Sequence, residues 1–322
     1  SPSFKYLILL INTNMSFVWK KISCLIKPSS NLPWWVSRRA GGACAIKRSD
    51  SNLFDFYITG IDREGRSRIG HALWDPDSPH KLLEIDNNPC IELGHPGTFS
   101  ENGTSYPSVI KIENKYYMFF TGWQLGKTVP FYNNLGLAFC TSSGGPFKYV
   151  SKAPIFPLSE TEPYGIGSCN VSFDNKNKIY RLFYTSFQKF IEKEEKVHHK
   201  YCLKYTQSKF INKWSSSDKF ILKNTSENDS KICKPTFIDN KNMLFCQRGI
   251  ESNYKIFSAT MRKNQWKKSN KPIKLVGEKS QWDEESQCYP FIFKYNNTNY
   301  LLYSGNNYGQ GGLGIAYQVD DK

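Results

Sequence analysis

One hairpin unit recurs five times along the sequence, and this periodicity constrains the fold more than any other feature. Each copy begins with a short apolar stretch, continues through a polar turn rich in Asn and Lys, and ends with an aromatic stretch that closes on a small residue. The closing residues stand at positions 60, 122, 186, 249 and 305, so that successive copies are about 60 residues apart. Such self-similarity is typical of repeat architectures built from one supersecondary unit. The copies span residues 42–60, 106–122, 169–186, 234–249 and 289–305.

Further apolar stretches after each hairpin predict sheets of four strands. A third stretch covers residues 68–73, 135–139, 201–205, 254–258 and 313–317, and a fourth covers residues 81–85, 147–150, 220–222 and 272–276. The fifth copy lacks a fourth stretch, but residues 17–22 resemble the fourth stretch of the second copy. Four-stranded antiparallel sheets repeated radially form a β-propeller. The sequence therefore predicts an all-β, five-bladed β-propeller whose last blade is closed by an N-terminal strand. The alternative is an open sandwich or a solenoid, although solenoid repeats are typically shorter.

The same pattern sets the expected domain organisation. We expect a single propeller domain over residues 17–322, preceded by an N-terminal extension over residues 1–16, because no part of the extension fits the repeat. The apolar stretch Tyr6–Ile11 is far shorter than the ~20 residues that cross a bilayer. It also lacks the small-residue cleavage site of a signal peptide. The sequence thus predicts no transmembrane segment.

Charge and cysteine usage restrict the partners and the compartment. The chain of 322 residues has 43 Lys and Arg against 28 Asp and Glu, a formal net charge of +15. This positive field would attract phosphates or anionic glycans, or it is simply a lysine-rich surface that favours solubility. The basic residues are scattered, so we expect no nucleic-acid partner. The nine cysteines are odd in number and contain no C-x-x-C pair. We therefore expect no disulfide framework, no metal, no cofactor and a reducing, cytoplasmic location.

The segments that precede the innermost strands are the candidate site, because in a propeller they converge at one mouth of the central channel. Three of these five entry loops contain carboxylates and the other two contain Arg or Lys. The expected catalytic residues are Glu101, Glu162, Asp283, Glu284 and Glu285. The expected substrate-binding residues are Arg38, Arg39, Trp123, Tyr164, Lys234, Tyr289, Asn306 and Tyr308.

These residue types suit carbohydrate chemistry. Glycoside cleavage needs one carboxyl group to protonate the leaving oxygen and a second as base or nucleophile. Arg39 and Lys234 would instead neutralise an acidic sugar or a phosphate. Each acid also has a simpler interpretation as a solvated loop charge or a cap at the end of a strand. Trp123 likewise suits packing between blades as well as sugar binding.

The entry-loop acids, the P-x-V hairpins and the length of the repeat carry a resemblance to a known group of enzymes. In these features the sequence resembles the five-bladed furanosidase superfamily, meaning glycoside hydrolase families 43, 32, 62 and 68. Three motifs, residues 60–67, 282–290 and 303–316, are more specifically similar to an uncharacterised bacterial branch often associated with surface-polysaccharide gene sets. The likeness covers about residues 17–319. The resemblance implies that Glu162 is the general acid, whereas Glu101 stands where the family has an Asp. Arg38 and Arg39 stand where its first blade supplies a carboxylate.

Two hypotheses about function follow from this incomplete catalytic set. In the first, the protein is a glycosidase that acts on a surface glycan, or during its assembly, with the Asp283–Glu285 cluster or Glu101 as the partner of Glu162. In the second, it is a glycan-binding propeller that has lost the first-blade Asp, and Arg39 and Lys234 bind an anionic sugar. A protein-interaction propeller is a third, less favoured class, because the distinctive charges lie at the channel mouth.

Overall fold

The computed structural model describes residues 17–319, and these residues form an all-β structure, as the sequence predicts. Within residues 17–319 the only helical elements are η1 (Glu227–Asp229) and the single turn α1 (Asn306–Gly309). No helix in the described residues has the length and apolar character needed to cross a membrane. The expected N-terminal extension, residues 1–16, lies outside the described residues.

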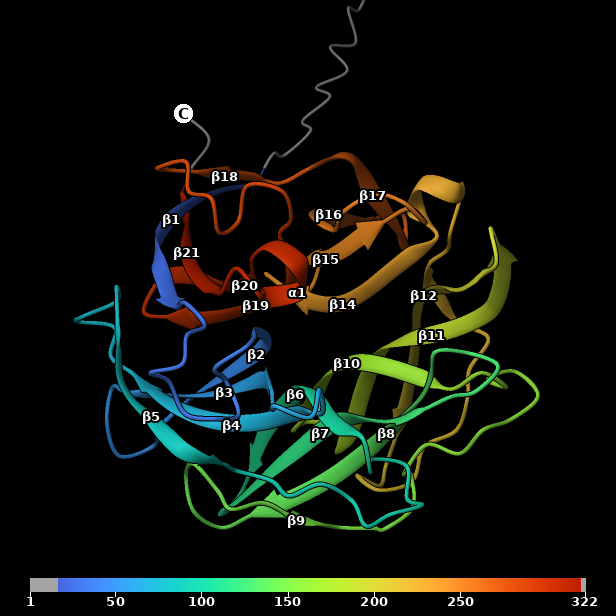
Figure 1. Ribbon diagram of the computed structural model, residues 1–322, viewed down its shortest axis with the longest axis horizontal. Helices are drawn as coiled ribbons and strands as arrows, with labels where there is room; N and C mark the ends of the chain where they lie inside the picture. The colour runs from blue at the N-terminus through green and yellow to red at the C-terminus, as the bar shows by residue number, and fades with distance from the viewer. Residues whose placement is uncertain (1–16, 320–322) are drawn as a thin grey trace, which may run out of the picture.

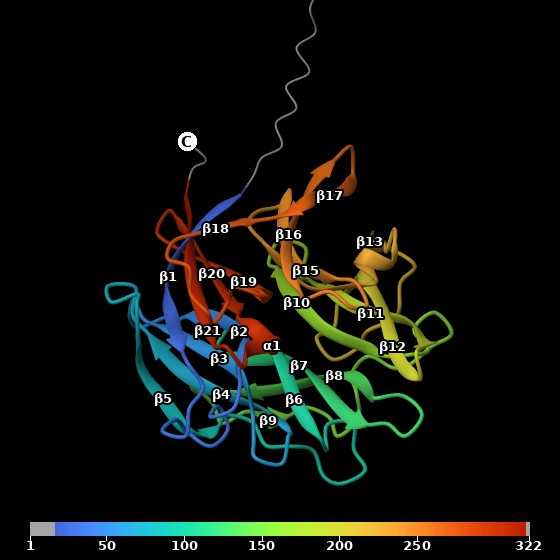
Figure 2. The same ribbon diagram turned by 45° about the horizontal axis from the view of Figure 1, so that its top comes forward.

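Antiparallel pairing arranges most strands in groups that follow one another around a common centre (Figures 1 and 2). The first group is β2 (Ala40–Lys47), β3 (Phe54–Ile61), β4 (Ser67–Trp74) and β5 (Leu82–Pro89). The second is β6 (Gly103–Ile112), β7 (Lys115–Leu125), β8 (Phe131–Cys140) and β9 (Lys148–Tyr149). The third is β10 (Ile166–Asp174), β11 (Ile179–Lys193), β12 (Lys196–Ser208) and β13 (Phe220–Leu222). The fourth is β14 (Lys231–Phe237), β15 (Asn242–Arg248), β16 (Lys255–Arg262) and β17 (Gln265–Pro272). The fifth is β19 (Cys288–Tyr295), β20 (Thr298–Ser304) and β21 (Leu313–Val319).

The N-terminal strand joins the fifth group at the other end of the chain. β1 (Val18–Ile26) pairs antiparallel with β21, from Val18 opposite Val319 to Ile26 opposite Leu313. This agrees with the expectation that the start of the chain supplies the outer strand of the last sheet. Figure 1 shows β1 and β21 side by side, so the two ends of the fold meet in one sheet.

The fourth group differs from the expectation at its outer edge. The strand predicted over residues 272–276 is divided: β17 ends at Pro272, and β18 (Lys274–Val276) leaves the group to pair in parallel with β1. The sequence of β17 is polar apart from Trp266, so no apolar alternation marks it. A two-residue period is the main signal of a half-buried strand, which is why sequence analysis placed the strand too late.

The first strands of the groups contact one another in a cyclic order. β2 contacts β6, β6 contacts β10, β10 contacts β14, β14 contacts β19, and β19 returns to β2. A side-chain hydroxyl accepts a hydrogen bond from a backbone N–H across each of these boundaries. The donor and acceptor pairs are Tyr106 and Thr59, Val171 and Ser108, Lys234 and Thr185, Ile292 and Thr236, and Gly42 and Ser304.

Each first strand also contains a bulge at the same place, near its start. In four groups the bulge holds a residue in the left-handed region: Gly42, Tyr106, Lys234 and Tyr289 have φ between 50° and 55°. Residues other than glycine rarely adopt such angles, and they tend to do so near functional sites. Gly42 has a local reason to be glycine, because a Cβ there would lie 2.6 Å from the Tyr106 ring.

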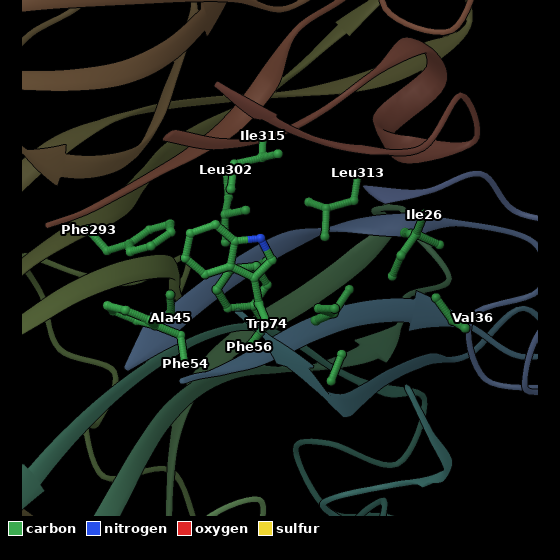
Figure 3. Packing of buried hydrophobic residues seen from close by; sticks show 14 of the residues in the cluster. Ile26, Val36, Ala45, Phe54, Phe56, Trp74, Phe293, Leu302, Leu313 and Ile315 are labelled. Carbon is green, nitrogen blue, oxygen red and sulfur yellow. The ribbon is translucent and has the colours of Figure 1, made fainter. Parts of the chain in front are cut away.

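Large aromatic residues fill the space between neighbouring groups. Phe54, Phe56 and Trp74 of the first group pack against Phe293 of the fifth, with ring centroids 5.1–5.5 Å apart (Figure 3). Burying a side chain of this kind stabilises the fold by about 1.5–3 kcal/mol. Much of the high aromatic content of the sequence thus serves packing between sheets.

Candidate functional site at the starts of the first strands

Two adjoining cavities open where the first strands begin. Their volumes are about 340 and 230 Å³, and both are lined by Tyr106, Phe131, Asn133, Tyr289 and Tyr308. Residues of β2 and β6 line the larger cavity, residues of β10 and β14 line the smaller one, and Tyr289 of β19 lies on both. We call them together the mouth cavities. Every group contributes residues to them.

Aromatic side chains form much of the mouth cavities. Tyr106 and Tyr289 meet edge to face, with ring centroids 4.8 Å apart. Burial raises the pKa of both phenols, so both stay neutral hydroxyl groups at ordinary pH. Trp123 lines the larger cavity, and its Nε1 donates to the Ser67 hydroxyl at 2.6 Å. Three of the expected binding residues, Trp123, Tyr289 and Tyr308, are therefore together in one place.

The charged residues that line the mouth cavities are cations. The Cζ of Arg39 lies 5.7 Å from the centroid of the Tyr308 ring, and the Cζ of Arg248 lies 5.6 Å from the same centroid. Tyr308 lies in the α1 turn, which contacts β2 beside the centre of the ring of strands (Figure 2). No aspartate or glutamate lines either cavity. The arrangement suits recognition of a polar, negatively charged ligand by aromatic faces, hydroxyl groups and guanidinium groups.

Glu162, the expected general acid, lies away from the mouth cavities in a buried ion pair. Its carboxylate is fully buried and lies 2.7 Å from Lys204 Nζ. The hydroxyl groups of Tyr184 and Ser186 donate to its two oxygens at 2.9 and 2.5 Å. Hydrogen bonds and an ion pair thus occupy both carboxylate oxygens, an environment that favours a structural role.

The expected acidic cluster of the fifth group is divided between the interior and the surface. Asp283 is fully buried, pairs with Lys21 at 2.8 Å and accepts from Tyr303 at 2.8 Å. Glu284 and Glu285 are exposed. Asn306 holds this loop in place, since its Oδ1 accepts from the backbone N–H of Glu285 and of Ser286. None of these residues lines the mouth cavities.

Glu101 belongs to a hydrogen-bonded turn at the entrance of the second group. Its carboxylate accepts from the Gly97 backbone N–H at 2.7 Å and from Gln124 Nε2 at 2.9 Å. These two bonds lower its pKa below the ordinary value for a glutamate. A carboxyl group that holds its charge in this way is poorly suited to act as a general acid at neutral pH.

The remaining expected binding residues have separate environments. Arg38 is exposed and donates to the backbone oxygens of Asp62 and Arg63. Tyr164 is 41% exposed and contacts Phe190. Lys234 is buried beside the Phe291 ring, and burial lowers its pKa. The structure thus brings Arg39, Trp123, Tyr289 and Tyr308 together, but not Arg38, Tyr164 or Lys234.

Several lining residues escaped the sequence analysis, above all Arg248. In four of the repeats a hydroxyl residue stands one position before the closing residue: Thr59, Thr121, Thr185 and Ser304. The fourth repeat has Arg248 at this position. Because Thr59, Thr121, Thr185 and Arg248 all line the mouth cavities, the single break in the hydroxyl pattern marks the site. Alignment of the five repeats at this position would have identified Arg248.

The part of the chain that the structure describes contains no evident metal-binding site. No group of three or more His, Cys, Asp or Glu side chains there could hold a metal ion. The nine cysteines are free thiols.

Several solved structures have the same fold as this chain. The chain matches a glycosyl hydrolase from Bacteroides ovatus with a TM-score of 0.66 at 14% identity, over 94% of both chains. It matches the catalytic domain of a GH62 α-L-arabinofuranosidase from Coprinopsis cinerea with a TM-score of 0.62 at 12% identity, over 94% of this chain and 98% of that one. The chain therefore shares its fold with these solved glycoside hydrolases.

Sequence relatives do not add a function to this fold. The chain is 28% identical over 302 residues to uncharacterised proteins from two strains of Mycobacterium tuberculosis, covering 92% of this chain and 98% of each relative. No protein-family model matches the chain.

Proposed function

We propose that this protein binds a carbohydrate in the mouth cavities and does not cleave it by a two-carboxylate mechanism. The observation that carries the proposal is the lining itself, which combines aromatic rings, hydroxyl groups and guanidinium groups with no carboxylate. The acids that sequence analysis expected to be catalytic are buried in ion pairs, hydrogen-bonded in a turn or exposed elsewhere. This favours the glycan-binding hypothesis over the glycosidase hypothesis.

The ligand class follows from the same lining. Flat aromatic faces and hydroxyl donors suit a sugar ring, and Arg39 beside Tyr308 suits a negative charge on that sugar. The resemblance to a branch associated with surface-polysaccharide gene sets makes a surface glycan, or an intermediate of its assembly, the first ligand to test.

We also propose that the strand groups are the blades of a five-bladed propeller with the mouth cavities at one end of its central channel. The cyclic contacts of the first strands and the hydroxyl bond across each boundary support this architecture. In this arrangement β1 closes the last blade as its outer strand.

Binding of oligosaccharides tests the proposed function directly. We expect isothermal titration calorimetry on a panel of neutral and anionic oligosaccharides to reveal a ligand that the wild type binds. The Trp123→Ala and Tyr308→Ala variants should bind this ligand at least about tenfold more weakly, because each loses a ring that lines the cavity. Tyr132→Ala is the matched control, since Tyr132 is an exposed tyrosine of β8 outside the cavity lining. Unchanged affinity in both cavity variants would refute the site.

Hydrolysis assays separate binding from catalysis. We expect no product when the wild type is incubated with aryl glycosides or with the bound oligosaccharide. Release of a reducing sugar that is lost in Glu101→Gln, in a Glu162→Gln variant that remains folded, or in the Glu284→Gln, Glu285→Gln double variant would restore the glycosidase hypothesis.

A further inference from the structure

Two nitrogen-bearing side chains, Arg248 and His199, line the smaller mouth cavity, and a third, Lys231, lies beside Arg248. Lys231 and Arg248 are directly opposite each other in the β14–β15 ladder, so both side chains lie on the same face of the sheet. His199 belongs to the neighbouring strand β12 and stacks on Tyr201, with ring centroids 5.1 Å apart. Tyr201 is itself the pairing partner of Lys231. We call these three residues the cationic corner.

The cationic corner is electrostatically unfavourable as it stands. Like charges directly opposite each other in a ladder destabilise a sheet. Burial, and then the charge of Arg248, lower the pKa of Lys231 to about 8. Burial, followed by the charges of Lys231 and Arg248, lowers the pKa of His199 to about 3, so its ring is neutral at ordinary pH. A bound anion would compensate these facing positive charges.

The corner has hydrogen-bonding capacity that the described residues do not use. Arg248 Nε and His199 Nδ1 are buried atoms without a hydrogen-bond partner. Lys231 is only 2% exposed and takes part in none of the ion pairs found among residues 17–319. The nearby acid Asp229 is already satisfied by Lys268, Thr225 and Ser226.

The geometry points to a phosphoryl group as the ligand of this corner, carried on the sugar whose binding is proposed above. A carboxylate has one negative charge, which a single guanidinium matches, whereas a phosphate monoester has a charge of about −1.5 to −2 at pH 7 and three acceptor oxygens. Two opposed cations and an imidazole donor match the larger charge and the greater number of acceptors. Arg39 contacts the same Tyr308 ring and lines the larger cavity, so the positive charge continues into it.

The test compares four probes with the full-length protein: inorganic phosphate, glucose 6-phosphate, glucuronate and glucose. We expect calorimetry and thermal unfolding to detect the two phosphates, with glucose 6-phosphate binding at least about tenfold more tightly than glucuronate or glucose. Arg248→Met and Lys231→Met should each weaken glucose 6-phosphate binding by about tenfold or more. Lys209→Met removes the same charge from an exposed position and should leave binding unchanged. Equal binding of glucuronate, or unchanged affinity in both corner variants, would overturn the proposal.

A second measurement keeps the inference independent of any single variant. Without ligand, Lys231→Met should have a higher Tm than the wild type, because it removes a buried cation that faces another. A lower Tm would show that Lys231 has a stabilising partner and would contradict an anion site. If phosphate binds through Arg248 but no oligosaccharide binds through Trp123, the proposed function alone fails. If the oligosaccharide binds and phosphate does not, this inference alone fails.

Discussion

At the scale of single residues, the buried acids of two entry loops connect strands of the same sheet. Glu162 in the third group and Asp283 in the fifth have equivalent surroundings. Each accepts from a tyrosine of the second strand, Tyr184 or Tyr303, and each pairs with a lysine farther out in its sheet. Acids with equivalent partners in two repeats indicate that they stabilise the repeated strand group. This explains why an acid in an entry loop is weak evidence for catalysis in such a fold.

Replacement of Glu162 should therefore lower stability. Glu162→Gln leaves the Lys204 ammonium buried without its carboxylate, and breaking one partner of a buried ion pair typically costs about 3–5 kcal/mol. We expect a loss of that order in the free energy of unfolding, measured by urea denaturation. Glu101→Gln, at a half-exposed carboxylate, should change it far less. Equal stability of Glu162→Gln and the wild type would show that the ion pair does not support the fold.

At the scale of elements, the hydroxyl at the end of three hairpins, that of Thr59, Thr185 or Ser304, connects one group to the next. Thr59 Oγ1 donates to the Gly42 carbonyl and accepts from the Tyr106 N–H, so it joins the first and second groups. Ser304 does the same between the fifth and first groups by accepting from the Gly42 N–H. The equivalent Thr121 Oγ1 is buried without a partner, and Ser108 makes the bond across that boundary instead.

This difference between equivalent threonines gives a matched pair of substitutions. Thr59→Val leaves a buried N–H and a buried carbonyl without partners, which costs about 1–3 kcal/mol in the free energy of unfolding. Thr121→Val, of the same shape, removes a hydroxyl that has no partner and should be neutral or stabilising. Urea denaturation of both variants checks the prediction, which fails if the two changes are equal.

At the scale of the whole molecule, the N-terminal strand joins the two ends of the chain. β1 covers the edge of β21, buries Trp19 and supplies Lys21, the cation of Asp283. Its removal uncovers a row of unpaired backbone groups, and such open edges favour association with other chains.

Truncation tests this dependence. A chain of residues 27–322 should aggregate or unfold at a markedly lower Tm, because it has an open sheet edge and an uncompensated buried aspartate. A chain of residues 17–322 should retain the Tm of the full chain, as expected for a propeller domain that begins at residue 17. Size-exclusion chromatography and thermal unfolding measure both outcomes. A monomeric 27–322 chain with an unchanged Tm would refute a structural role for β1.

Local patterns in the sequence were sufficient to predict the repeat, the all-β class and the N-terminal strand beside the last hairpin, because strand periodicity and repeated closing residues are local. They also indicated three of the aromatic residues that line the cavities, Trp123, Tyr289 and Tyr308. Which charges face the cavities became evident from the folded structure alone. Glu162 and Asp283 have the sequence context of a catalytic site, yet each forms an ion pair with a lysine from another strand. Arg248 closes a hairpin in the sequence, yet lies beside Tyr308 in the fold. The direction and the partners of a charged side chain depend on contacts across many residues, and a local pattern does not contain them.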